Sequence, residues 1–315
     1  MNATEAGQHI LVTGGTGFIG AQLLKQLLAA GHRVSLFSRQ PAAAMAKFNG
    51  TDGAKGKVSA FSNWSELPDD AQFDAVVNLA GTPVVGPRWS AARKQVLLDS
   101  RVGTTEGLMS WIARASVKPS VLVNGSAIGY YGCRGDEALD ESAPPQDEFM
   151  SELCQKWEAA ALKAEDFGLR VVRLRLGLVF CSHDDKGGAL PKLIAPYYFG
   201  VGGKMGDGQQ VMSWVHRDDV IAVILRALHD SSLSGAVNMT APEAPTQAQF
   251  AKAVGQALHR PTFIATPACV IDTLAGEMGA LFTKGQRVVP KKLLDAGYVF
   301  KYPTLDSALK AYLGK

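Results

Sequence analysis

The amino-acid sequence predicts an α/β fold, with a doubly wound parallel sheet and a smaller C-terminal lobe. Apolar, strand-like runs alternate with helical patterns through residues 9–180, which is typical of parallel βαβ units. Several of these runs, including residues 76–80 and 121–123, are apolar on both faces, as in strands covered by helices on both sides. A glycine-rich turn between the first strand and the first helix supports the same architecture.

The elements follow in order along the chain. Strand patterns occupy residues 9–13, 33–39, 58–61, 74–80, 120–127, 169–180 and 236–240, and helical patterns occupy 18–30, 90–115, 220–228 and 247–258. We expect Asp218 and Asp219 to cap the helix that begins at residue 220. The turn residues Gly206-Asp207-Gly208 predict a hairpin before a strand at 211–215.

The glycine-rich turn has the spacing G-x-x-G-x-x-G, at Gly14, Gly17 and Gly20. Gly14 permits a tight turn off the strand, Gly17 lets the backbone approach a pyrophosphate, and Gly20 allows close packing of helix on strand. The phosphates then lie at the positively polarised N-terminus of the helix. We therefore predict a dinucleotide site that includes Gly14, Thr16, Gly17, Phe18, Ile19 and Gly20.

The end of the second strand indicates which dinucleotide is bound. A site that prefers NAD carries Asp or Glu there, to accept hydrogen bonds from the ribose 2′-hydroxyl. This chain has Ser38 and Arg39 instead, and it contains no acidic residue between Glu5 and Asp52. A guanidinium group binds a 2′-phosphate that a carboxylate would repel. We therefore predict that the site binds NADP(H). The alternative is that Arg39 is a solvated cation on the surface.

The glycine-rich turn and the change in composition after residue 180 together suggest two parts. We assign residues 1–180 to an NADP-binding domain, whose sheet is completed by parts of 210–240, and residues 181–315 to a smaller substrate lobe. Glycine and proline gather between residues 187 and 208. This predicts loops over the carboxyl ends of the strands, where ligands of open α/β sheets bind.

The composition excludes several classes of protein. The net charge of +3 is too small to indicate a nucleic-acid or anionic-membrane partner, and no apolar run is long enough for a membrane span. The four cysteines and six histidines are scattered without metal-ligand spacing, so we expect no metal site. The N-terminus has no hydrophobic core of a signal peptide, and we expect a cytoplasmic protein with a small-molecule substrate. The sequence leaves the oligomeric state open.

Four motifs occur in order: the TGGTGFIG turn, Asn78-Leu79-Ala80-Gly81, Gly125-Ser126, and the run from Ser213 to Val220. Together they resemble the extended branch of the short-chain dehydrogenase/reductase family, which has a Rossmann fold. Residues 126–132 and the Gln-Arg-Val-Val-Pro segment at 286–290 are similar to an atypical subgroup, described as nucleoside-diphosphate-sugar epimerase-like, with a C-terminal domain of unknown function. We add Ser38, Arg39, Leu79, Ala80, Gly81 and Arg101 to the predicted cofactor site.

The sequence departs from that family at its catalytic dyad. The family uses Tyr-x-x-x-Lys on the helix after the fifth strand, and no such pair occurs in this chain. The two positions fall on Leu153 and Trp157, and a shift of one residue gives Cys154 and Glu158, which do not restore the chemistry. We predict Ser126 and Tyr131 as candidate catalytic residues. Ser126 can instead be structural, and adjacent tyrosines can serve packing alone.

Two functions remain open at this point. The first is an NADP(H)-dependent oxidoreductase or epimerase-like enzyme that acts on a small carbonyl or sugar-like metabolite. The alternative is a non-catalytic NADP(H)-binding protein that senses redox state or serves as a scaffold. The missing dyad favours the second function, whereas Ser126 and the elaborated lobe favour the first.

Overall fold

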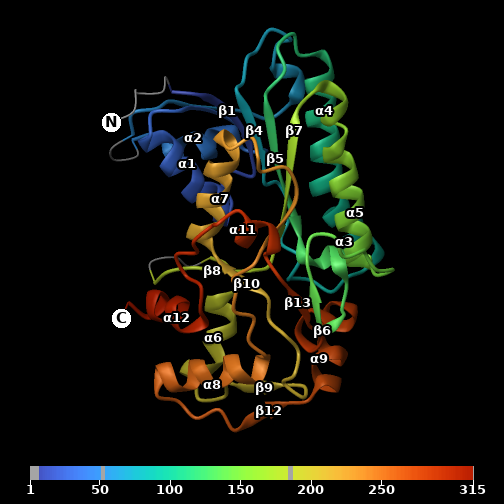
Figure 1. Ribbon diagram of the computed structural model, residues 1–315, viewed down its shortest axis with the longest axis vertical. Coiled ribbons are helices and arrows are strands. Elements are labelled where there is room, and N and C mark those ends of the chain that lie inside the picture. The colour runs from blue at the N-terminus through green and yellow to red at the C-terminus, as the bar shows by residue number, and fades with distance from the viewer. Residues whose placement is uncertain (1–6, 51–53, 184–186, 315) are drawn as a thin grey trace.

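Seven parallel strands form the central sheet, in the order β11-β7-β5-β4-β1-β2-β3. The computed structural model describes residues 7–50, 54–183 and 187–314. From β1 the chain builds the sheet in one direction to β3 and then in the other direction through β4, so the topological switch point lies between β1 and β4. The predicted doubly wound parallel sheet is confirmed (Figure 1).

The carboxyl ends of the strands are aligned along one edge. Thr13 at the end of the first strand is paired in register with Phe37 on one side and with Asn78 on the other. Asn78 is paired in turn with Asn124. The strands of the sheet are β1 (His9–Thr13), β2 (Arg33–Phe37), β3 (Val58–Phe61), β4 (Ala75–Asn78), β5 (Val121–Ala127), β7 (Arg170–Leu176) and β11 (Gly235–Met239).

Helices cover both faces of the sheet and bury its apolar side chains. On one face, α1 (Phe18–Ala29), α2 (Pro41–Phe48) and α7 (Arg217–His229) contribute to a single core cluster with the strands. On the other face, α4 (Thr104–Arg114) and α5 (Phe149–Leu162) form a second cluster around the buried Trp111. Figure 1 shows these two helical layers on either side of the strands.

The helix predicted over residues 90–115 is present, but it has a widened turn in the middle. It consists of α3 (Ala91–Leu98), a π-helical turn η2 (Asp99–Gly103) and α4. Such π-helical turns are rare and frequently lie at functional sites. This turn carries Arg101 at the edge of the sheet where the strands end.

The C-terminal lobe packs around its own core at the carboxyl edge of the sheet. Phe180 and Trp214 stack there with their ring centroids 5.0 Å apart, beside Phe250. Three two-stranded parallel sheets belong to this region. Its strands and helices are β6 (Gly135–Leu139), β8 (Leu178–Phe180), β9 (Gly203–Met205), β10 (Trp214–His216), β12 (Ile264–Thr266), β13 (Gln286–Val288), α6 (Leu190–Tyr198), α8 (Gln247–Leu258), α9 (Ala268–Ala275), α10 (Ala280–Thr283), α11 (Lys291–Asp295) and α12 (Leu305–Leu313).

Two predicted elements differ in the structure. The run 169–180 is divided at Gly177, whose N–H donates to Met239 O, and the chain continues as β8 beside β10. The predicted hairpin at 206–208 is wrong. Gly206 and Gly208 form a turn with φ of 59° and 74°, but β9 pairs in parallel with β12, and β10 pairs with β8. The local turn residues could not indicate these distant strand partners.

The predicted cap of α7 is also wrong. The N-cap is His216, whose Nδ1 accepts from the N–H of Asp218 at 3.2 Å. Asp219 instead accepts hydrogen bonds from Tyr298 Oη at 3.0 Å and from the backbone N–H of Lys301 at 2.7 Å. Burial raises the pKa of Asp219, and these donors partly oppose that shift. Asp219 therefore anchors the C-terminal segment to α7.

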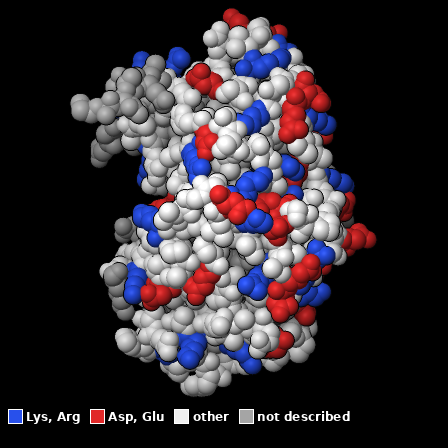
Figure 2. Space-filling model, viewed as in Figure 1, with Lys and Arg blue, Asp and Glu red and all other residues white. Residues whose placement is uncertain are grey.

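Basic and acidic side chains are interspersed over the face of the molecule in Figure 2 rather than separated by sign. The net charge of the chain is only +3. No helix within the described ranges is long and apolar enough to cross a membrane.

Candidate functional site

The turn between β1 and α1 has the geometry predicted for each of its three glycines. Gly14 adopts φ of +68°, and a Cβ atom there would lie 2.4 Å from Leu79 O. A Cβ atom at Gly20 would lie 2.3 Å from Gly14 O, so helix and turn pack closely. At Gly17, a Cβ atom would meet only Gly14 O, at 3.1 Å. Gly17 is exposed, so its open side is available to a ligand.

The first turn of α1 leaves its backbone N–H groups available to an anion. The N-cap residue is Gly17, which has no side chain to accept from these groups, and the first turn contains no acidic residue. The free N–H groups belong to the first helical residues, Phe18, Ile19 and Gly20. The uncapped N-terminus of this 12-residue helix attracts negative charge through its unpaired N–H groups and the helix dipole.

Glycines from the lobe pack against this turn. A Cβ atom at Gly188, which has φ of +81°, would lie 2.8 Å from Phe18 Cζ, and one at Gly187 would lie 2.3 Å from Phe18 Cδ2. On Arg217, the guanidinium carbon lies 5.0 Å from the centroid of the Phe18 ring. The glycine-rich segment of the lobe therefore closes over the start of α1.

Cationic side chains surround the end of β2. Arg39 is exposed, and Ser38 is half-buried beside it. The structure adds Lys47 from α2, whose Nζ donates to Thr16 O at 2.9 Å and so reaches back to the glycine turn. Lys47 is not among the predicted site residues, because the sequence around it gives no sign that α2 folds back over the turn.

A buried hydrogen-bond network supports the carboxyl ends of β1, β4 and β5. Thr13 Oγ1 donates to Asn78 Oδ1 at 2.5 Å, and Asn78 Nδ2 donates to Asn124 Oδ1 at 2.5 Å. Ala80 N–H donates to Thr13 Oγ1 at 3.2 Å. These bonds fix the predicted residues Leu79, Ala80 and Gly81 beside the glycine turn.

Arg101 reaches this loop from the π-helical turn η2. Its Nη2 donates to Thr82 O at 3.0 Å, and its Nη1 donates to Leu97 O at 3.2 Å. A Cβ atom at Gly81 would lie 3.0 Å from Arg101 Cζ, so the guanidinium group packs directly on the Gly81 backbone. The structure thus brings together two predicted site residues that are 20 positions apart in the sequence.

Ser126 lies at the end of β5, with 2% of its surface exposed. Its hydroxyl donates to Glu158 Oε1 at 2.7 Å. That carboxylate also accepts from Arg175 Nε at 2.8 Å and from Arg173 Nη1 at 2.7 Å. Hydrogen bonds and the charge of Glu158 raise the pKa of Arg175, although burial alone would lower it. The Ser126 proton is therefore directed into a buried ionic cluster.

Tyr131, the second candidate catalytic residue, is fully buried, so its hydroxyl has no access to a ligand. Its hydroxyl donates to Asn238 Oδ1 at 2.6 Å and accepts from Arg175 Nη1 at 2.8 Å. Burial raises the pKa of Tyr131 to about 12, even though Arg175 acts in the opposite direction. Both hydrogen bonds tie the loop after β5 to neighbouring strands of the sheet.

The two positions on α5 where the family carries its Tyr and Lys are occupied by buried apolar side chains. Leu153 and Trp157 are buried, and a Cβ atom at Gly125 would lie 3.0 Å from the Trp157 ring. Cys154, one turn before Glu158, is buried too, and burial raises the pKa of its thiol to about 12. Sequence reasoning missed the structural role of Glu158. The sequence signal for this role was a carboxylate within an otherwise apolar helix face, followed by a strand, β7, that carries Arg173 and Arg175.

The lobe holds the loop that follows Ser126. Gln286, the first residue of the Gln-Arg-Val-Val-Pro segment, donates from Nε2 to Ile128 O at 2.7 Å. Its own backbone carbonyl accepts from Ser213 Oγ at 2.8 Å. Two of the motifs noted in the sequence therefore meet at the end of β5, where they fix the short helix η3 (Ile128–Tyr131).

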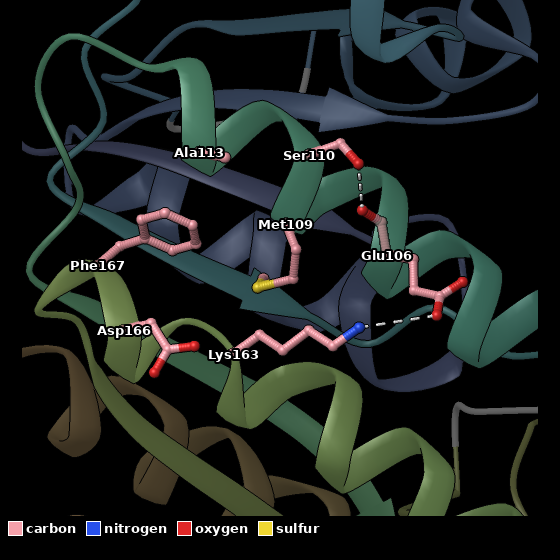
Figure 3. Close-up of a pocket in the computed structure, with 7 residues that line it drawn as sticks. All are labelled: Glu106, Met109, Ser110, Ala113, Lys163, Asp166 and Phe167. Atoms are coloured by element: carbon pink, nitrogen blue, oxygen red, sulfur yellow. Dashed lines mark hydrogen bonds and ion pairs between the residues drawn. The ribbon is translucent and has the colours of Figure 1, made fainter.

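A surface hollow of about 450 Å³ lies elsewhere, on the outer side of α4 and α5 (Figure 3). Lys163 faces Glu106 across it, with Nζ and Oε1 4.0 Å apart. The remaining lining residues are Met109, Ser110, Ala113, Asp166 and Phe167. None of the predicted site residues lines this hollow. Among the described residues, no cluster of His, Cys, Asp and Glu could hold a metal ion.

Comparison with known proteins agrees with this geometry. Residues 10–239 match the NAD dependent epimerase/dehydratase family, and residues 266–312 match a domain of unknown function, DUF1731. Epimerase family protein SDR39U1 of Bos taurus is 38% identical over 96% of this chain and 98% of its own length. The chloroplastic homologue of Arabidopsis thaliana is 34% identical over 98% of this chain and 88% of its own.

A solved structure of a relative shows the same architecture. The human epimerase family protein SDR39U1, crystallised with NADPH, superposes with a TM-score of 0.80 at 34% identity, covering 96% of this chain and 98% of the human one. The resemblance inferred from the motifs is confirmed by these matches. This chain belongs to the NAD dependent epimerase/dehydratase family and carries the DUF1731 segment at its C-terminus.

Proposed function

We propose that this protein binds NADP(H) and acts as an oxidoreductase or epimerase-like enzyme on a small carbonyl or sugar-like metabolite. The observation that carries the proposal is the uncapped, acid-free N-terminus of α1 beside the open Gly17 and the cations at the end of β2. This arrangement suits both a pyrophosphate and a 2′-phosphate. The NADPH complex of the human relative supports the same cofactor.

The predicted cofactor residues are assigned to different parts of NADP(H) in this proposal. The turn from Gly14 to Gly20 holds the pyrophosphate, Ser38 and Arg39 hold the 2′-phosphate, and Leu79 to Gly81 with Arg101 line the nicotinamide half. When bound, NADP(H) supplies or accepts a hydride. In this assignment, residues 1–180 with parts of 210–240 hold the cofactor, and residues 181–315 shape the substrate side.

The proton step cannot rest on the usual dyad. The Ser126 hydroxyl already donates to Glu158, and the Tyr131 hydroxyl is buried between Asn238 and Arg175. For either hydroxyl to reach a substrate, the buried cluster would have to open. In the proposed enzyme, the proton therefore comes from water or from the substrate itself.

Non-catalytic NADP(H) binding is a second candidate, and the closed cluster around Ser126 favours it. The same assay separates the two functions. NADPH and NADH are first titrated onto the protein. Small carbonyl compounds are then screened for NADPH oxidation, and sugars are screened by NMR for epimerisation, which leaves the redox state of the cofactor unchanged. Turnover of one compound supports the enzyme. Tight NADPH binding without turnover of any compound supports the redox sensor or scaffold, whereas failure to bind either nucleotide contradicts both proposals.

A further inference from the structure

Arg101 is a positively charged group set into the carboxyl edge of the sheet. Its guanidinium group lies against the backbone of Gly81, and the centroid of the Trp157 ring lies 5.3 Å from Arg101 Cζ. Backbone carbonyls of Leu97 and Thr82 accept from its nitrogens. These contacts fix the position of the charge, and none of them neutralises it.

Within the described ranges, no carboxylate pairs with Arg101. There, the Arg101 side chain donates hydrogen bonds to the backbone carbonyls of Leu97 and Thr82 and to the Ser100 hydroxyl. A second cation, Arg93, lies two helical turns earlier and donates to Pro83 O at 2.5 Å. Burial lowers the pKa of Arg101, the neighbouring Cys154 thiol opposes that shift, and repulsion from Arg93 adds to it, although the guanidinium group stays protonated at neutral pH. The local positive charge is thus uncompensated.

The sheet topology indicates which half of the cofactor faces this charge. The pyrophosphate position is at the start of α1, after β1, and the adenosine position lies beyond it, at the end of β2. Gly81 follows β4, on the opposite side of β1. An extended dinucleotide therefore directs its nicotinamide half toward Gly81 and Arg101. This step rests on the proposed function.

We propose that Arg101 makes the site selective for the reduced cofactor, NADPH, over NADP⁺. The nicotinamide ring is neutral in NADPH and carries a positive charge in NADP⁺, while the rest of the molecule is the same. A fixed, half-buried cation repels only the oxidised ring, because partial removal from water strengthens the interaction between charges. Arg101 is thus a specificity-determining residue for redox state.

The test compares the dissociation constants of NADPH and NADP⁺ by calorimetry for the unmodified protein and four variants. We expect the unmodified protein to bind NADPH ~10-fold tighter than NADP⁺, which is ~1.4 kcal/mol or ~30 mV for a two-electron couple. Arg101→Met should bring the ratio close to one. Arg101→Lys keeps the charge and should retain most of the preference. Arg101→Gln provides a second neutral variant if the Met variant folds poorly.

Arg39→Met is the matched control. Arg39 lies at the adenosine end, which is identical in the two redox forms, so this substitution should weaken both forms equally and leave their ratio unchanged. An unmodified protein that binds both forms equally, or a ratio unaffected by both neutral variants, would overturn the proposal. Failure to bind either form would instead contradict the proposed function itself, because even the redox-independent contacts would then be absent.

Discussion

The ends of β1 and β2 and the end of β5 lie on the same edge of one sheet, but they differ in access and charge. At β1 and β2, Gly17 and Arg39 are exposed, and the backbone N–H groups of α1 have no cap. At β5, Ser126 and Glu158 are each 2% exposed, and the Glu158 carboxylate is paired with Arg173 and Arg175. The first region is arranged to receive a ligand, whereas the second is already satisfied by the protein itself.

We infer from this difference that the proposed cofactor binding and any proton chemistry depend on separate parts of the sheet edge. A binding region needs unpaired donors at the surface, and the start of α1 provides them. A proton-transfer group needs contact with the substrate and a suitable pKa. Ser126 and Tyr131 lack that contact because their hydroxyls already have protein partners. Substitutions in the two regions should therefore affect different measurements.

The largest expected effect belongs to the buried region. Glu158→Gln removes the carboxylate charge that Arg173 and Arg175 share, and leaves two guanidinium groups facing an amide. Breaking a buried ion pair by removing one partner costs about 3–5 kcal/mol of unfolding free energy. Urea denaturation measures this loss. Glu152→Gln is the control: its carboxylate lies on the exposed side of the same helix, paired with Lys156, and should change stability by less than about 1 kcal/mol. Equal stability of the two variants would show that the cluster is not structural.

Gly17→Val tests the open region. The branched side chain would occupy the exposed side of the turn at Gly17, so NADPH affinity should fall by ~100-fold or more, about 2.7 kcal/mol. Gly17→Ala adds a single Cβ atom 3.1 Å from Gly14 O and should cause a smaller loss. Calorimetric titration measures the affinity, and circular dichroism confirms that both variants are folded. If the Val variant kept full affinity, the phosphate site would have to lie elsewhere.

Arg39→Asp tests cofactor choice at the end of β2. We expect the unmodified protein to prefer NADPH over NADH by ~10-fold or more, about 1.4 kcal/mol. The substitution replaces a cation with a carboxylate that repels the 2′-phosphate, so the preference should vanish or invert. Arg33→Asp changes an exposed arginine at the opposite end of the same strand and should leave the preference for NADPH unchanged. Equal binding of NADPH and NADH to the unmodified protein would rule out the NADP assignment.

Tyr131→Phe distinguishes packing from catalysis, and of these substitutions it should change ligand binding and turnover the least. Loss of the hydroxyl leaves Asn238 and Arg175 each without one buried partner, which costs about 1–3 kcal/mol of unfolding free energy. Turnover of any substrate found in the screen should hardly change. A general acid contributes about 10²–10⁴-fold in rate. A loss of that size, with stability unchanged, would show that the Tyr131 hydroxyl reaches the substrate and that the buried cluster opens.

Much of the geometry of the glycine turn could be predicted because its signals are local. Gly14, Gly17 and Gly20 lie within seven consecutive residues, and their conformational freedom is a property of each residue alone. The alternation of strands and helices has the same local origin. The contacts of Lys47 and Arg101 could not be predicted from local signals. Each residue contacts the glycine turn or its neighbouring loop only after the sheet has formed.

The cap of α7 and the division of the strand at Gly177 show where local reasoning failed. Asp218 and Asp219 have the chemistry of capping residues, yet His216 forms the cap, and Asp219 binds Tyr298 and Lys301, about 80 residues later in the chain. Partners so distant in sequence are chosen by tertiary packing. The same holds for β8, which pairs with β10 across the lobe.

The sequence by itself determined the doubly wound sheet, the glycine turn and the absence of a Tyr-x-x-x-Lys dyad, since these depend on short-range pattern and residue identity. The tertiary structure alone decided that Ser126 donates to Glu158, that Tyr131 is buried, and that Arg101 packs on Gly81. Each of these contacts joins separate elements of the fold. Whether a hydroxyl or a guanidinium group faces a ligand or a protein partner depends on what the fold places around it, and no local pattern records that.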